Sequence, residues 1–204
     1  ALILAGVKKG DEVLCQSFTF AASANPIIYQ RAKPVFIDSE IDTWNMCPLL
    51  LEEAILDRIS KGVKPKAIIF VHLYGMPAKI KEISLIAKKY SIILIEDAAE
   101  ALGSTYNGEK CGTFGDYGII SFNENKILTT FGGGVLICKN EEDKKRAIYL
   151  ARQAKEKYYY YQHSEIGYNY RMDILSASLG ISEFKKIEEY IISRTKVNLF
   201  YKDL

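Results

Sequence analysis

Two side chains of opposite charge, Lys126 and Asp97, have the types and positions that chemistry at a ring cofactor requires. Lys126 comes shortly after the apolar residues 117–122, and Asp97 comes directly after the apolar run 91–95 and Glu96. An amine forms a Schiff base with an aldehyde, and a carboxylate holds a proton on a pyridine nitrogen. A lysine and an aspartate at the exits of two buried strands therefore predict a pyridoxal phosphate site.

Position alone leaves a second interpretation open for each of these residues. An acid that follows a strand also serves as the N-cap of the next helix, and a loop lysine is commonly a solvated surface charge. The apolar neighbours Ile127 and Leu128 favour a partly buried amine for Lys126. The pairing of Lys126 with Asp97, rather than either residue alone, favours the cofactor site.

Further side chains could contact the same cofactor. Glu100 would share a face with Asp97 on a following helical turn, where it could reach the phenolic oxygen or the ring, or act as a cap. The Ser121 hydroxyl could bind a phosphate or a backbone group. Phe18 or Phe20 could stack on the pyridine ring, or pack in the core.

Other common site patterns are absent from the sequence. The glycines at 132–134 match neither a Walker loop nor GxGxxG, so they predict a tight turn rather than a nucleotide site. His72 and His163 lack metal-ligand spacing, and the four cysteines are scattered without a CxxC pair. We therefore expect no metal site and four reduced thiols.

The composition is that of a globular domain with its own core. The chain has 204 residues, of which 49% are hydrophobic and 25% charged, so one large domain is expected. A net charge of +2, without a basic stripe, argues against a nucleic-acid partner. No apolar run is long enough for a membrane span, and no signal-peptide pattern opens the chain. These features, with the unpaired cysteines, predict a cytoplasmic protein.

Strands alternate with helices along the chain, which predicts an α/β fold with a mostly parallel sheet. Ligands of such sheets bind outside the carboxyl ends of the strands, where Asp97 and Lys126 are expected. The predicted strands are 12–15, 35–38, 66–71, 91–95, 117–122 and 134–138. The predicted helices are 49–60, one opened by Pro77 and ending near 90, and further helices from 141 and after 172.

Both ends of the chain read as interruptions of helices. Residues 1–6 resemble the tail of a helix, and Leu204 lies inside another helical pattern that has no cap. We therefore expect an internal piece of a longer protein.

A series of motifs in fixed order resembles one family from about Gly6 to Leu204. The motifs are GDEV, SFTFAASANPI, AKPVFID, VHLYG, IEDAAEALGS, GTFGDYG, SFNENKILTTFGGG and GYNYRM. They are similar to the DegT/DnrJ/EryC1/StrS sugar aminotransferases, most of all to those that aminate UDP-4-keto-6-deoxy-N-acetylglucosamine. The resemblance implies the large domain of a type I (aspartate aminotransferase-like) transferase dependent on pyridoxal phosphate.

The resemblance also assigns roles to single residues. It implies that Lys126 in SFNENK is the Schiff-base lysine, and that Asp97 in IEDAAE is the partner of the pyridinium nitrogen. Glu100 stands where many members carry glutamine, and Phe20 in SFTF would stack on the ring.

Two further residues are assigned by the resemblance to the cofactor phosphate. Ser121 would bind this phosphate, and Asn169 in GYNYR would reach the phosphate of a neighbouring subunit's cofactor. The second role implies a homodimer with shared active sites.

The function that the resemblance implies is amino transfer from glutamate to a 4-keto-6-deoxy nucleotide sugar, with UDP favoured. A non-catalytic regulatory homologue and a related sugar dehydratase are the alternatives, although the dehydratases carry histidine in place of the lysine. Full members are longer, so residues 1–204 would be the large domain without an upstream segment and a carboxy-terminal small domain.

Overall fold

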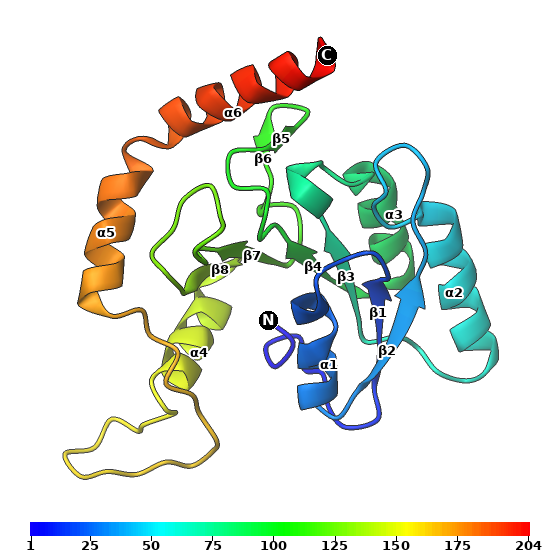
Figure 1. Ribbon diagram of the computed structural model, residues 1–204. Coiled ribbons are helices and arrows are strands. Elements are labelled where there is room, and N and C mark those ends of the chain that lie inside the picture. The colour runs from blue at the N-terminus through cyan, green and yellow to red at the C-terminus, as the bar shows by residue number, and fades with distance from the viewer.

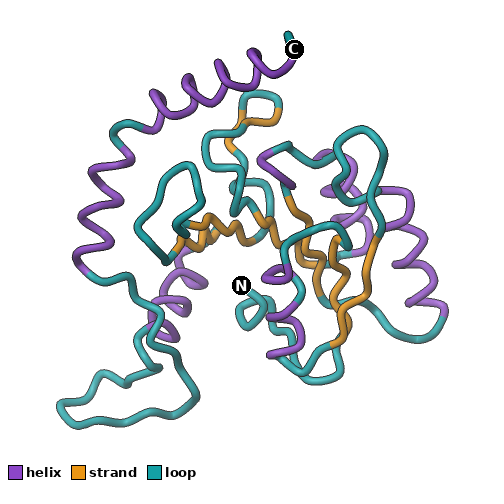
Figure 2. The backbone as a smooth tube through the Cα atoms, in the orientation of Figure 1, coloured by secondary structure: helices purple, strands orange, loops and turns teal.

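The computed structural model describes residues 1–204, with a six-stranded sheet at its centre (Figures 1 and 2). The strand order is β2-β1-β3-β4-β7-β8. The first five strands of this order run parallel, whereas β8 is antiparallel to β7. The strands are β1 (Glu12–Gln16), β2 (Lys33–Ile37), β3 (Ala67–Val71), β4 (Ile93–Asp97), β7 (Tyr117–Ser121) and β8 (Gly134–Cys138). The predicted α/β fold with a mostly parallel sheet is confirmed.

Helices cover both faces of this sheet. On one face, α2 (Pro48–Ser60) and α3 (Ile80–Tyr90) bury their apolar side chains against the strands. On the other face, α1 (Asn25–Tyr29) and the N-terminal turn enclose a smaller core. All residues of β1 and β3 are buried, as expected of parallel strands that are covered on two sides.

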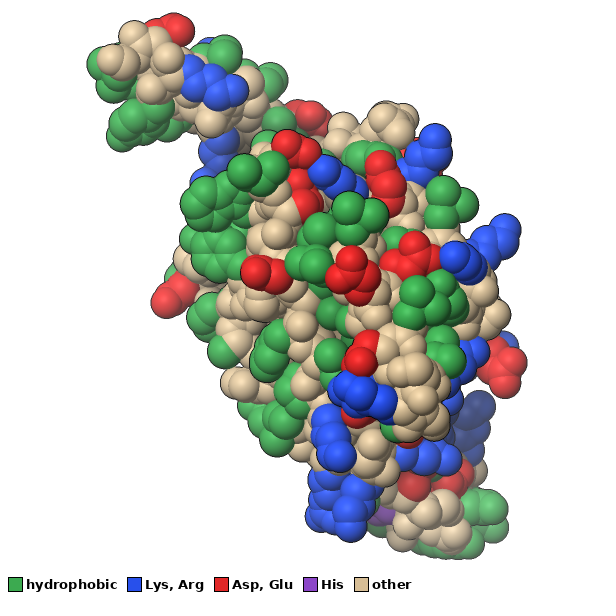
Figure 3. Space-filling view, turned by 90° about the vertical axis from the view of Figure 1, so that its right-hand side faces the viewer, with side chains coloured by type: hydrophobic (Ala, Val, Ile, Leu, Met, Phe, Trp, Pro, Cys, Tyr) green, Lys and Arg blue, Asp and Glu red, His purple; other side chains and the backbone are tan.

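The outer surface of the α2 and α3 layer carries charges of both signs. Figure 3 shows this face, on which acidic and basic side chains are interspersed among hydrophobic ones. Lys89 of α3 pairs with Glu52 of α2 at an Nζ–Oε1 distance of 2.7 Å. No helix of the structure combines the length and the apolar character needed to cross a membrane.

After the sheet, the chain forms an arm of helices. The helix α4 (Glu141–Ala151) is followed by a long loop and then by α5 (Ile174–Phe184) and α6 (Ile187–Lys202). Figure 1 shows α6 passing over the hairpin of β5 (Thr105–Tyr106) and β6 (Glu109–Lys110). No residue of α5 is buried, and α6 buries only Ile187.

Several predicted boundaries differ from the structure. Glu96 and Asp97 are the last residues of β4 and do not follow it. The helix after β3 begins at Ile80 and not at Pro77, because the N–H of Ala78 donates to His72 and holds the segment in a loop. Residues 1–6 form a hydrogen-bonded turn.

The sequence prediction also missed a hairpin, formed by β5 (Thr105–Tyr106) and β6 (Glu109–Lys110). Asn107 and Gly108 form its turn, and both have positive φ angles, of 51° and 86°. An Asn-Gly pair is a strong hairpin signal. It was overlooked because the flanking strands are two residues long and lack an apolar alternation.

Candidate active site

A cavity of about 720 Å³ opens beyond the carboxyl ends of β3, β4 and β7. Its walls are the loops that follow these three strands, together with one face of α6. Lys126, Glu100 and Ser121 all line it. The structure therefore brings three of the predicted site residues together at the edge of a parallel sheet where ligands bind.

Lys126 faces an acid in this cavity. Its Nζ lies 3.5 Å from Glu100 Oε1, and its side chain is only 17% exposed. The other oxygen of Glu100 accepts the N–H of Tyr74 at 2.8 Å. Lys126 is thus a partly buried amine next to a fixed carboxylate, and not a free surface charge.

Asp97 is held by two hydrogen bonds at the end of β4. Its Oδ1 accepts the N–H of Ala99 at 3.1 Å, and its Oδ2 accepts the Ser23 hydroxyl at 2.6 Å. Turns, and no helix, lie between Asp97 and β5. The N-cap interpretation of Asp97 is therefore wrong, and so is the expectation that Glu100 lies on a helical turn.

Ser23 was not singled out from the sequence, yet it connects Asp97 to the segment that carries Phe20. The Ser23 hydroxyl donates to Asp97, because an ionised carboxylate can only accept. In the 2.9 Å contact between the Ser23 and Thr19 hydroxyls, Thr19 is therefore the donor. The N–H of Ser23 donates to the Phe20 carbonyl at 3.0 Å. The spacing of Thr19 and Ser23, four positions apart, could have indicated that the two hydroxyls interact. The sequence does not indicate that Asp97 is the acceptor of the Ser23 hydroxyl.

Phe20 presents an uncovered ring beside this hydroxyl chain. It precedes the short 3-10 helix Ala21–Ser23, and 81% of its surface is exposed. Phe18, the other candidate for stacking, packs against Trp44 with ring centroids 5.8 Å apart. Of the two phenylalanines, Phe20 is therefore the one free to stack on a planar ligand.

Ser121 and Asn169 differ in their relation to the cavity. Ser121 is the last residue of β7, and its hydroxyl accepts the N–H of Asn123 at 3.3 Å. Asn169 is exposed and bridges to Arg152 at the end of α4, outside the cavity. Within one chain Asn169 does not meet Lys126, and its reach into a neighbouring subunit stays a prediction.

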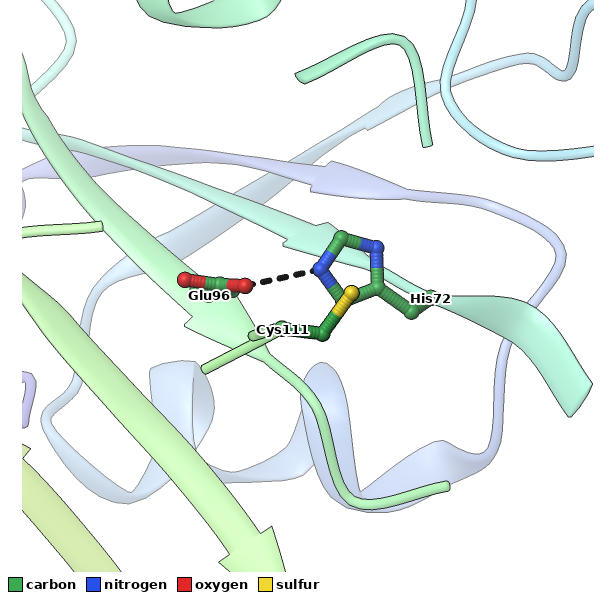
Figure 4. A group of neighbouring side chains, drawn as sticks. All are labelled: His72, Glu96 and Cys111. Atoms are coloured by element: carbon green, nitrogen blue, oxygen red, sulfur yellow. Dashed lines mark hydrogen bonds and ion pairs between the residues drawn. The ribbon is translucent and has the colours of Figure 1, made fainter. Parts of the chain in front are cut away.

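Next to Asp97 in β4, the buried Glu96 pairs with His72 (Figure 4). The N–H of Ala78 donates to His72 Nδ1 at 3.0 Å, so Nδ1 is the acceptor nitrogen. The proton therefore sits on Nε2, which lies 2.8 Å from Glu96 Oε1 and donates to it. Cys111 Sγ lies within 4.8 Å of both groups. Both ring nitrogens of His72 form hydrogen bonds within the protein, so these three residues have the geometry of a structural hydrogen-bonded cluster and not that of a metal site.

Glu96 also holds the loop between β6 and β7. The backbone N–H groups of Gly112, Phe114 and Gly115 donate to its carboxylate at 2.5, 2.7 and 2.9 Å. Burial by itself would raise the pKa of Glu96. The hydrogen bonds from His72, Gly112 and Gly115 outweigh it, and the pKa is lowered. Glu96 is thus an ionised, fully hydrogen-bonded anchor directly beside Asp97.

Replacing Glu96 by glutamine is expected to lower the free energy of unfolding by about 2–4 kcal/mol, because an amide would turn an N–H₂ group toward buried N–H donors. The lowered pKa means that the stabilisation is present at neutral pH and is lost as the pH falls below the ordinary glutamate value of about 4.3. Urea denaturation at several pH values measures both effects. Glu109→Gln, on the exposed hairpin, is the control, and equal stability of the two variants would contradict the assignment.

Comparison with known proteins identifies the family. The family model described as the DegT/DnrJ/EryC1/StrS aminotransferase family matches residues 1–204. The chain belongs to this family. Pyridoxal phosphate is the family's cofactor, so the predictions of family and cofactor are both confirmed.

Curated relatives of this DegT/DnrJ/EryC1/StrS family member cover nearly all of the chain. It is 51% identical over 203 residues to EpsN of Bacillus subtilis, named as a pyridoxal phosphate-dependent aminotransferase, covering 100% of this chain and 52% of EpsN. It is 37% identical over 202 residues to GDP-perosamine synthase of Escherichia coli O157:H7, and the match covers 99% of this chain and 54% of the synthase. The chain therefore spans about half the length of these relatives.

A solved structure of the same family has the same fold. An aminotransferase from Brucella abortus superposes with a TM-score of 0.93 at 33% identity, over 99% of this chain and 54% of that one. The sugar aminotransferase Spr1654 from Streptococcus pneumoniae, in its PLP form, gives a TM-score of 0.84 at 29% identity, over 92% of this chain and 52% of Spr1654. The predicted type I transferase fold is confirmed.

The residues of this family member fit the cofactor chemically. The partly buried Lys126 amine suits an aldehyde, and the Asp97 carboxylate suits a protonated ring nitrogen. The Phe20 ring, 81% exposed, offers the uncovered aromatic face that a planar ring needs.

Replacing Ser23 by alanine in the full-length protein is expected to raise the dissociation constant for pyridoxal phosphate by about 3- to 10-fold, because one hydrogen bond that orients Asp97 is lost. Absorbance titration of the cofactor-free protein measures this constant. Ser39→Ala is the matched control, because the buried Ser39 hydroxyl has no hydrogen-bond partner. If Ser23→Ala binds the cofactor as tightly as the control does, Ser23 does not position Asp97.

Proposed function

We propose that the full protein is a pyridoxal phosphate-dependent aminotransferase that moves an amino group from glutamate to a 4-keto-6-deoxy nucleotide sugar, with UDP as the favoured nucleotide. The observation that carries this proposal is the cavity in which Lys126 is held beside Glu100 at the edge of the sheet. The names of similar proteins support the substrate class, since they include GDP-perosamine synthase and UDP-2-acetamido-2-deoxy-3-oxo-D-glucuronate aminotransferase.

Each residue of the site has a task in this proposal. When bound, the cofactor supplies an electron sink for the carbon that loses a proton. Lys126 would hold the cofactor through its aldehyde and, once the amine of the donor has displaced it, its free amine would take and return the proton at the donor carbon, as general base and acid. Asp97 keeps the ring nitrogen protonated, and Phe20 orients the ring from one face. Glu100 holds the Lys126 amine in place, since the two side chains already meet at 3.5 Å.

The phosphate end of the cofactor is assigned to Ser121 and to Asn169 of a second subunit. Ser121 lines the cavity, whereas Asn169 lies exposed at the end of α4 and faces no part of the cavity in its own chain. This separation supports a homodimer in which two chains share each site. In this proposal residues 1–204 are the cofactor-binding large domain.

The proposed compartment is the cytoplasm. All four cysteines are free thiols, and Cys15 and Cys111 are buried. Unpaired cysteines are typical of a reducing compartment.

Mixing the purified full-length protein with glutamate tests the amino-transfer activity. A visible absorption band of the bound cofactor should shift on addition of glutamate and return on addition of a 4-keto nucleotide sugar. A regulatory homologue would bind the cofactor without this shift, and a dehydratase would yield a product without new nitrogen. Product mass after offering UDP-, GDP- and dTDP-linked keto sugars identifies the acceptor.

A further inference from the structure

We propose that Arg194 and Asn198 of α6 form an anion-binding position in the Lys126 cavity, which receives phosphate or carboxylate oxygens of a substrate. The inference rests on the proposed function, because that reaction has two anionic substrates. One carries a diphosphate and the other carries carboxylates. Lys126, Glu100 and Ser121 lie on other walls of the cavity, and α6 supplies none of them.

One face of α6 closes the cavity. Ile191, Arg194, Thr195 and Asn198 all line it, and their spacing of three, four and seven positions places them on a single helical face. The Thr195 hydroxyl donates to the Ile191 carbonyl at 2.9 Å, so its proton is already used. Arg194 and Asn198 are the donors that remain on this face.

α6 approaches the loop that carries Glu100 closely at one point, between Ile191 and Gly103. A β-carbon added at Gly103 would lie 2.6 Å from Ile191 Cδ1, and Gly103 has a φ angle of +96°. A side chain at position 103 would be strained at this φ angle and would require the end of the Ile191 side chain to move. Gly103 thus permits the close approach of α6, whose polar face lines the cavity that contains Lys126.

The charges in the cavity favour an anion. Its charged lining residues are Glu100, Lys126 and Arg194. Glu100 and Lys126 pair with each other at 3.5 Å, whereas Arg194 forms no ion pair or side-chain hydrogen bond in the structure. The cavity therefore has one uncompensated positive charge, on a group with five donors whose planar geometry matches carboxylate and phosphate.

The test compares Arg194→Ala, Arg194→Lys and Lys196→Ala in the full-length protein. Lys196 lies on the same helix but does not line the cavity, so Lys196→Ala is the control. Titration calorimetry with UDP measures the diphosphate, and the glutamate concentration that half-shifts the cofactor band measures the carboxylates. Arg194→Ala should weaken one of the two by about 10- to 100-fold, with a smaller loss in Arg194→Lys.

The two measurements distinguish the sources of the anion. Weaker UDP binding with unchanged glutamate dependence assigns Arg194 to the nucleotide sugar. The reverse result assigns it to the amino donor. Unchanged values for both ligands in Arg194→Ala would overturn the inference. If the wild-type protein shows no band shift with glutamate, the proposed function fails, and the UDP measurement still tests Arg194.

Discussion

Replacing Lys126 by alanine is expected to lower the rate of amino transfer by about 10³- to 10⁴-fold, because the variant lacks the group that moves the proton. The variant should also lose the visible absorption band that the cofactor has when it is bound to the lysine. Both effects follow from one amine, which is 17% exposed and lies 3.5 Å from Glu100. Stopped-flow spectroscopy and a product assay measure them on the full-length protein.

The matched control for this variant is Lys9→Ala, which removes an exposed lysine outside the cavity. Small external amines should restore part of the activity of Lys126→Ala, since they can supply the missing base. An alanine variant that keeps both its band and its turnover would disprove the assignment of Lys126 as the catalytic residue.

Replacing Asp97 by asparagine is expected to reduce turnover by about 10²- to 10³-fold, because an uncharged amide no longer stabilises the proton on the ring nitrogen. The hydrogen bonds around the position can largely persist, because the amide oxygen can accept the N–H of Ala99 as Oδ1 does, and the amide nitrogen can donate to the Ser23 hydroxyl, which lies 2.6 Å from Oδ2 in the wild-type protein. The loss should therefore appear mainly in the rate and less in protein stability. Steady-state kinetics and thermal melting of the full-length protein measure the two quantities.

The control for the charge change is Asp203→Asn, at the exposed end of α6. It should leave both turnover and melting temperature unchanged. If Asp97→Asn has wild-type turnover with the cofactor bound, the carboxylate does not act on the ring nitrogen.

The sheet, the strand-end position of Asp97 and the position of Lys126 in the loop after β7 were predictable because the buried strands are short apolar runs between helical patterns. Asp97 follows Ile95 by two positions, so an apolar run and an acid were enough to locate the end of β4 within two residues. The same signal placed Ser121 at the end of β7.

The contacts made between distant residues could not be predicted. Glu96 meets the N–H groups of Gly112 and Gly115 across a loop, and Ser23 meets Asp97 across 74 positions of the chain. A sequence pattern indicates whether a segment forms a helix or a strand. It does not indicate which distant residue a polar side chain contacts in the folded protein. Arg194 was overlooked for the same reason, since its helix shows no distinctive pattern.

The two walls of the cavity differ in how firmly the rest of the chain holds them, and this difference has a thermodynamic consequence. One wall consists of the loops at the ends of the central strands, whose residues are mostly buried. The other wall is α6, which buries only Ile187. Local opening of a segment with few buried contacts requires little free energy, so amide hydrogens of α6 should exchange with solvent faster than those of β4. A ligand that contacts only the strand ends meets a preorganised surface. A ligand that also engages Arg194 restricts α6, and part of its binding energy is offset by lost conformational entropy.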